Sequence, residues 1–154
     1  GLNYLQSRNV IHGDIKPENI LKFRNNFKYS DFGMSKICNI KYTDNNLYTF
    51  FYRPPEINKN IFGLKSDIWA LGCTLYEIYF NKRYFNLSSN KELYHISIEN
   101  KDIIYILIKQ MIEENLDKRL DIKFLCIFFN IKPLEKDKLN AIFPYDTSKS
   151  RKNN

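Results

Sequence analysis

The chain has few cysteines and no long apolar run, and each scarcity excludes a class of protein. Its three cysteines, at positions 38, 73 and 126, form no C-x-x-C pair. An odd, widely spaced set disfavours a disulfide framework or a zinc site and favours a reducing, intracellular compartment, cytoplasmic or nuclear. The longest apolar runs, 103–108 and 124–129, fall far short of the ~20 residues that cross a bilayer. We therefore expect no membrane partner.

Glycine is also scarce, and the basic charge lacks a pattern. The five glycines form no G-x-G-x-x-G loop, so no backbone cradle for phosphates is predicted. The net charge of +7 comes from lysines scattered between positions 16 and 152, without a nucleic-acid-binding motif. We expect no nucleic-acid partner. A hydrophobic content of 44% in 154 residues is enough for the core of a single domain.

Four polar residues near the start carry the clearest chemistry. The stretch His12-Gly13-Asp14-Ile15-Lys16-Pro17-Glu18-Asn19 is followed by Asp31-Phe32-Gly33. Apolar residues predict strands at 20–23 and 27–30 with a turn at Asn25-Asn26, which would return Asp31 beside Asn19. An acid, a lysine, an amide and a second acid in one cleft suit a nucleoside triphosphate, its magnesium ions and an acceptor hydroxyl.

These residues resemble the catalytic loop, H-R-D-L-x-x-x-N, and the D-F-G motif of eukaryotic protein kinases. Three later blocks are similar to that family in order and spacing. They are Tyr52-Arg53-Pro54-Pro55-Glu56, like its A-P-E segment; Ser66-Asp67-Ile68-Trp69-Ala70-Leu71-Gly72, like the start of its large central helix; and Asp117-Lys118-Arg119, like its late arginine. The resemblance covers about residues 1–129.

The resemblance implies an α+β, mainly α-helical fold, a kinase C-terminal lobe with a short β-hairpin beside the catalytic loop. We expect this incomplete domain over 1–129, its N-terminal lobe lying elsewhere in cis, and a basic, frayed tail over 130–154. The sequence also predicts a short helix at 55–60 and a helix at 66–80 with Ser66 as N-cap, apolar nearly all round and therefore central. Further helices are expected near 89–98, 101–114 and 121–129, and a turn at 44–46.

The implied function is a serine/threonine protein kinase that uses ATP and Mg²⁺ to phosphorylate a protein hydroxyl. Asp14 would be the catalytic base and Lys16 would neutralise the transferring phosphoryl group. Asn19 and Asp31 would be magnesium ligands. Leu21 would lie beneath the adenine, although a strand leucine in the core fits equally well. Taken singly, the polar residues also suit turn and capping roles.

The remaining motif residues have implied structural roles. His12 would pack under Phe32, with Gly33 completing the D-F-G motif. Thr49 would help to hold Asp14 and Lys16, as in serine/threonine kinases, although an ordinary segment hydroxyl is the alternative.

A second set of implied roles concerns the lower part of the lobe. Glu56 and Arg119 would form a buried bidentate ion pair. Asp67 would hold the backbone of the catalytic loop. Gly13 stands where most family members have arginine, which weakens any control by phosphorylation of the loop.

Two functions remain open from the sequence. One is an enzyme that is active when complete; the other is a truncated or degenerate kinase relic that scaffolds partners without catalysis. An in-frame Gly-rich loop encoded upstream would favour the enzyme, and stop codons would favour the relic. A small-molecule kinase is disfavoured by Pro55-Glu56 and Asp67, which match protein-substrate machinery.

Overall fold

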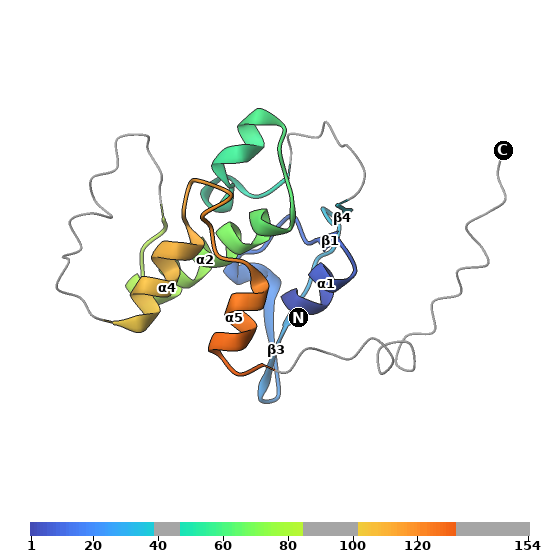
Figure 1. Cartoon of the computed structure of the whole chain (residues 1–154). Coiled ribbons are helices and arrows are strands. Elements are labelled where there is room, and N and C mark those ends of the chain that lie inside the picture. The colour runs from blue at the N-terminus through green and yellow to red at the C-terminus, as the bar shows by residue number, and fades with distance from the viewer. Residues whose placement is uncertain (39–46, 85–101, 132–154) are drawn as a thin grey trace, which may run out of the picture.

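The computed structural model describes residues 1–38, 47–84 and 102–131. These ranges combine helices with two small antiparallel sheets, in agreement with the predicted α+β class, and α2 lies between the other elements (Figure 1). The helices are α1 (Leu2–Ser7), α2 (Leu64–Phe80), α4 (Ile103–Met111) and α5 (Ile122–Phe128), and the short 3-10 helices are η1 (Pro17–Asn19), η2 (Phe50–Tyr52) and η3 (Pro55–Lys59). The strands are β1 (Val10–Ile11), β2 (Ile20–Phe23), β3 (Asn26–Tyr29) and β4 (Lys36–Ile37).

Helix α2 begins earlier than the sequence predicts. Its N-cap is Gly63, so the prediction that Ser66 is the cap is wrong. Ser66 lies in the first turn, and its hydroxyl accepts the Gly63 N–H at 3.1 Å. A polar side chain at the third helical position can satisfy the amide of the capping residue from inside the helix, which explains the misassignment. The helix ends before Asn81, which has a left-handed φ of 53°.

The predicted central burial of α2 holds only for its first half. Ile68, Trp69 and Cys73 are buried, whereas Ile78 is 64% exposed. β1, η2 and α4 all pack against this helix, and Phe80 at its end still contacts Tyr105 of α4. The last turn presents apolar residues to the surface, which the all-round apolar pattern did not distinguish from a buried turn.

The β2–β3 hairpin is shifted from its predicted position. Phe23 pairs with Asn26, so the turn residues are Arg24 and Asn25, and the expected turn at Asn25-Asn26 is wrong by one position. Arg24 adopts a left-handed φ of 54°, which a two-residue hairpin turn requires. Two asparagines signalled a turn nearby but did not fix its register.

A second strand pair, β1 with β4, was not predicted from the sequence. Val10 pairs with Ile37 and Ile11 with Lys36. Two-residue strands are too short for an alternating pattern. The loop of residues 12–19 runs between β1 and β2, and the loop of 30–35 between β3 and β4. The two sheets therefore hold both polar loops in neighbouring positions.

The later helices are slightly shorter than expected. Asp102 caps α4 and Asp121 caps α5, each accepting a backbone N–H with its carboxylate. The predicted short helix at 55–60 is the 3-10 helix η3. The predicted helix at 89–98, the turn at 44–46 and the tail from 132 onward lie outside the described residues. No helix among the described residues is long and apolar enough to span a membrane.

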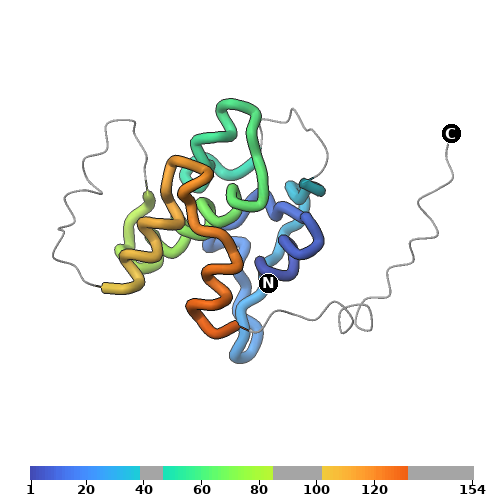
Figure 2. Tube along the Cα trace, in the orientation of Figure 1, coloured from blue at the N-terminus to red at the C-terminus, as the bar shows by residue number. Residues whose placement is uncertain are grey.

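One continuous core joins these elements. Figure 2 shows the first helix and the last described helix close together, and α1 packs against α5. Gln6 of α1 also donates to the Leu64 carbonyl at 2.8 Å. The buried apolar side chains come from every part of the described chain: Leu2, Ile11, Ile15, Leu47, Tyr48, Tyr52, Ile57, Ile68, Trp69, Ala70, Cys73, Tyr84, Leu107, Ile108, Met111, Ile112 and Leu125.

Gly72 allows α2 and α4 to approach closely, which gives a test of this packing. A Cβ at Gly72 would lie 2.8 Å from Ile112 Cγ2 and 2.9 Å from Met111 Cβ. Gly72→Ala should lower the free energy of unfolding by about 1–3 kcal/mol, measured by urea denaturation, because the helices must separate. Gly63→Ala, where a Cβ meets no atom within 4 Å, should change it by less than about 1 kcal/mol. Equal effects would contradict the close approach.

Candidate active site

The loop of residues 12–19 is anchored to α2 by one buried carboxylate. Asp67 accepts the backbone N–H of His12 at 2.7 Å and that of Gly13 at 3.1 Å. It also accepts the Tyr48 hydroxyl at 3.0 Å. The Asp67 side chain is fully buried, and this burial raises its pKa while the three donors oppose the rise. The carboxylate therefore fixes the backbone directly before Asp14.

Asp14 lies at the centre of a compact polar cluster. Its Oδ1 accepts the Thr49 hydroxyl at 2.7 Å and the Thr49 N–H at 3.1 Å. Its Oδ2 lies 2.7 Å from Lys16 Nζ and accepts the Asn19 amide N–H at 3.0 Å. Lys16 Nζ also donates to the Thr49 hydroxyl at 2.9 Å. The structure thus brings four of the predicted site residues into direct contact.

The surroundings of Asp14 keep it ionised. Burial opposes the charge, but the Lys16 ammonium and both Thr49 donors outweigh it and lower the pKa of Asp14 below its ordinary value. At neutral pH the carboxylate is a hydrogen-bond acceptor held in one orientation. Such a group can orient an acceptor hydroxyl and take up its proton as the reaction completes.

Asn19 and Asp31 lie on adjoining backbone. The Ser30 N–H donates to the Asn19 carbonyl at 2.9 Å, so Asp31 follows the residue bound to Asn19. Asp31 adopts a left-handed φ of 57°, and its Oδ1 accepts the Gly33 N–H at 3.2 Å. Its side chain is exposed, and no contact joins it directly to Asp14 or Asn19.

Free oxygen atoms at these two residues fit a hard cation. The Asn19 amide nitrogen is used by Asp14, while its side-chain oxygen accepts no hydrogen bond within the described part of the chain. Asp31 likewise uses only one of its carboxylate oxygens there. The described residues contain no cluster of three metal-ligating acids, histidines or cysteines. This donor set suits Mg²⁺, which takes one or two protein oxygens and fills its other positions with water and phosphate.

His12 couples the two loops through its ring and both ring nitrogens. Its ring lies 5.0 Å from that of Phe32 and 5.5 Å from that of Tyr29. Nδ1 accepts the Asp14 N–H at 3.3 Å, so the neutral ring can donate from Nε2 to the Ser30 carbonyl at 3.1 Å. This fully buried ring thus orients Asp14 on one side and the residue before Asp31 on the other.

Leu21 does not belong to the core. It is 53% exposed on β2, which excludes the alternative of a core leucine. Phe23 and Phe27 on the same hairpin are exposed as well. Among the described residues, no contact joins Leu21 to the Asp14 cluster.

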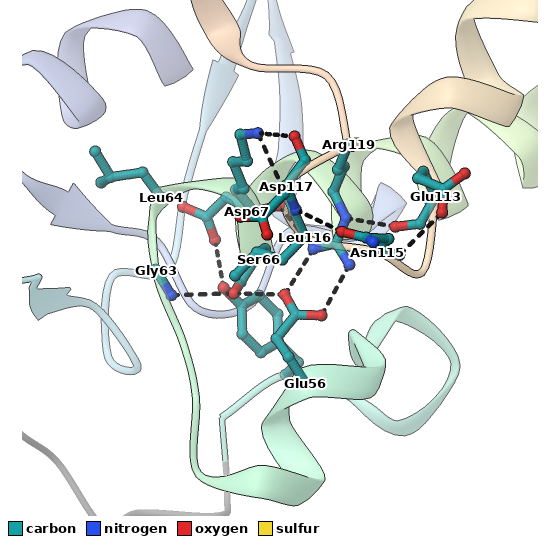
Figure 3. Close-up of polar contacts among 12 residues, drawn as sticks. Glu56, Gly63, Leu64, Ser66, Asp67, Glu113, Asn115, Leu116, Asp117 and Arg119 are labelled. Atoms are coloured by element: carbon teal, nitrogen blue, oxygen red, sulfur yellow. Dashed lines mark hydrogen bonds and ion pairs between the residues drawn. The ribbon is translucent and has the colours of Figure 1, made fainter.

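A buried ion pair holds the second half of the site. Arg119 Nη1 and Nη2 donate to the two carboxylate oxygens of Glu56 at 2.6 and 2.8 Å (Figure 3). The guanidinium also donates to the carbonyls of Glu113 and Lys65. Ser66 completes the network by donating to Glu56 at 2.9 Å. This network ties η3, the start of α2 and the segment before α5 into one unit.

Two contributors were not predicted from the sequence. Ser66 was assigned to helix capping, yet its hydroxyl also supports Glu56. Tyr48 contributes a buried hydroxyl to Asp67, although no motif in the sequence includes it. The only signal for Tyr48 was its place directly before Thr49.

Comparison with known proteins gives the family of this site. The model of the protein kinase domain matches residues 1–138, most of the chain. The chain belongs to the protein kinase family. The matched range includes the Asp14 cluster, Asp31 and the Glu56–Arg119 ion pair.

Individual relatives of this protein kinase chain include several serine/threonine kinases. It is 34% identical over 137 residues to serine/threonine-protein kinase nekl-2 of Caenorhabditis elegans, covering 80% of this chain and 38% of that protein. It is 34% identical over 125 residues to the G2-specific protein kinase fin1 of Schizosaccharomyces pombe, covering 73% and 17%. Cyclin-dependent kinase 12 of Drosophila melanogaster is 36% identical over 97 residues, covering 58% and 8%. The chain therefore spans well under half the length of these relatives.

The buried ion pair gives a direct test of the lower half of this kinase site. Arg119→Leu should lower the free energy of unfolding by about 3–5 kcal/mol, because it leaves the Glu56 carboxylate buried and unpaired. Urea denaturation measures the change. The matched control is Arg83→Leu, whose partner Glu77 lies 3.5 Å away in a pair open to solvent. The control should cost no more than about 1 kcal/mol.

Adding Glu56→Gln to the Arg119→Leu variant should restore part of the stability, since it removes the stranded charge. A small loss for Arg119→Leu, equal to that of Arg83→Leu, would show that the pair does not brace the fold.

Proposed function

We propose that this chain is the C-terminal lobe of a serine/threonine protein kinase, which transfers the γ-phosphoryl group of ATP to a hydroxyl of a protein. One observation carries the proposal. Asp14, Lys16 and Asn19, on a loop anchored to α2, form a single hydrogen-bonded cluster with Thr49 of a later segment. The relatives named as serine/threonine kinases support the same chemistry.

Each residue of the cluster has a definite task. Asp14 accepts a hydrogen bond from the incoming hydroxyl and receives its proton, while the bond from the hydroxyl oxygen to the γ-phosphorus forms and the bond to the β-phosphate oxygen breaks. Lys16 can turn its ammonium from Asp14 toward the transferring phosphoryl oxygens. Thr49 keeps the carboxylate of Asp14 oriented during this exchange. Its contact with both residues is the specific support for a serine/threonine acceptor.

Magnesium would be held by the Asn19 amide oxygen and the Asp31 carboxylate. When bound, the ion neutralises and aligns the phosphates. The two side chains are positioned for this by the Ser30–Asn19 backbone hydrogen bond and by the His12–Ser30 contact.

The hairpin is the proposed floor of the nucleotide site. Leu21 would contact the adenine, and the exposed Phe23 and Phe27 would be covered by an N-terminal lobe in cis. That lobe would bring the Gly-rich loop that residues 1–154 do not contain. The three free thiols are consistent with the proposed intracellular location.

The alternative is a non-catalytic scaffold that retains the kinase fold. The exposed apolar hairpin favours a binding role to the extent that a partner protein covers it. Under this alternative the Asp14 cluster would have no catalytic role, and substituting its residues would leave partner binding unchanged.

Asp14→Asn in the full-length protein should separate the two functions. The amide cannot accept the proton, so turnover with Mg-ATP and a serine- or threonine-containing substrate should fall about 10²–10⁴-fold. Affinity for ATP should stay within about twofold, because Asp14 acts on the acceptor hydroxyl. Radiolabel transfer and calorimetry measure the two quantities.

The matched control for Asp14→Asn is Asp117→Asn, an exposed acid outside the cluster, which should keep normal turnover. Unchanged turnover in Asp14→Asn, or none in the wild-type protein, would contradict the proposed function.

Activity should not depend on phosphorylation of the segment that contains Thr49. Gly13 has no side chain to bind a phosphate, and its φ is 80°. A Cβ at this position would lie 2.7 Å from the Met34 carbonyl oxygen, so the backbone leaves no room for a side chain. Full-length protein treated with phosphatase should therefore keep its turnover within about twofold. Loss of turnover that returns on rephosphorylation would contradict this prediction.

A further inference from the structure

Tyr48 joins the segment before Thr49 to the loop of residues 12–19 and to α2. Its side chain is 2% exposed. Its hydroxyl donates to Asp67 Oδ1 at 3.0 Å, and its N–H donates to the Gly13 carbonyl at 2.8 Å. Its own carbonyl accepts Arg53 Nη2 at 3.2 Å. One residue is thus held at its backbone on both sides and at the end of its side chain.

The backbone of Tyr48 shows that these contacts fix an unfavourable conformation. Its φ is 66°, in the left-handed region that a bulky residue adopts only when its surroundings hold it there. The next residue is Thr49, whose N–H and hydroxyl both bind Asp14. The conformation of Tyr48 therefore determines where the two donors of Thr49 point.

Asp67 joins both sides of this arrangement. The same Oδ1 that accepts the Tyr48 hydroxyl accepts the Gly13 N–H at 3.1 Å. Gly13 precedes Asp14, and Tyr48 precedes Thr49. The buried carboxylate therefore sets the separation of Asp14 from Thr49 by binding the residue before each of them.

We propose that Tyr48 is a positioning residue, which locks Thr49 onto Asp14 through its hydrogen bond to Asp67. This inference rests on the proposed kinase function and adds a residue that none of the recognised motifs contains. Burial and the Asp67 carboxylate both raise the pKa of the Tyr48 hydroxyl, which keeps it protonated as a donor.

The experiment uses Tyr48→Phe in the full-length protein, which removes one hydroxyl and keeps the ring. We expect kcat to fall about 10-fold while KM for ATP changes less than about twofold, because the loss acts on the acceptor side of the site. The matched control is Tyr84→Phe, a buried tyrosine whose ring packs on Trp69 and Tyr76. It should leave both constants unchanged.

A double-mutant cycle tests whether Tyr48 acts through Thr49. Thr49→Val removes the hydroxyl that binds Asp14. In that background Tyr48→Phe should lower kcat by less than about twofold further, because the contact that it positions is already lost. Fully additive effects would overturn the proposal and leave Tyr48 a structural residue.

Hydrogen exchange gives a readout that does not need activity. In Tyr48→Phe, peptides that cover 12–14 and 47–53 should exchange faster than in the wild type, whereas those of α5 should not. Unchanged exchange in both peptides overturns the proposal even if the wild type proves to have no kinase activity. If Tyr48→Phe does not fold, Arg53→Met, which frees the Tyr48 carbonyl, must show the same local increase, and its absence counts equally against the proposal.

Discussion

The buried carboxylate of Asp67 is the interaction on which the rest of the site depends. It joins α2 to the loop that carries Asp14 and to the segment that carries Thr49. A buried charge of this kind is stable only because each oxygen is used by a donor, and losing any donor leaves a desolvated group. The cost of burying Asp67 thus enforces the geometry of its three partners.

A buried ion pair between Glu56 and Arg119 has a similar effect at the other end of the segment that begins at Tyr48. The two terminal nitrogens of the Arg119 guanidinium bind the two carboxylate oxygens of Glu56. The Cζ atom of Arg119 also lies 5.0 Å from the centre of the Trp69 ring, which places the guanidinium over the core. The segment from Tyr48 to Glu56 is therefore fixed at both ends. Tyr48 is bound by Asp67 of α2, and Glu56 is bound by Arg119.

The sequence predicted which polar residues lie together better than it predicted their local geometry. Spacing and order placed Asp14, Lys16 and Asn19 in one cleft, and the structure brings them into contact. The pairing of Glu56 with Arg119, 63 positions apart, followed only from the family resemblance. The hairpin turn was misplaced by one residue because asparagine favours turns without fixing register.

Other features could not be predicted because their cause is tertiary. Strands β1 and β4 are two residues each, too short for a local pattern, and they pair residues that are far apart in the chain. The burial of Tyr48 could not be read from its neighbours in the sequence. Its left-handed backbone is held by contacts with Asp67, Gly13 and Arg53, which come together only in the folded chain. Ser66 looked like a cap, and its bond to Glu56 depends on where η3 lies in space.

The most direct test is a crystal structure of the full-length protein with magnesium and a non-hydrolysable ATP analogue. The account predicts the Asn19 amide oxygen and an Asp31 carboxylate oxygen about 2.0–2.1 Å from magnesium, with Lys16 against the γ-phosphate and Asp14 facing the acceptor site. A nucleotide bound elsewhere, or Asp31 directed away from a metal held by other residues, would contradict it.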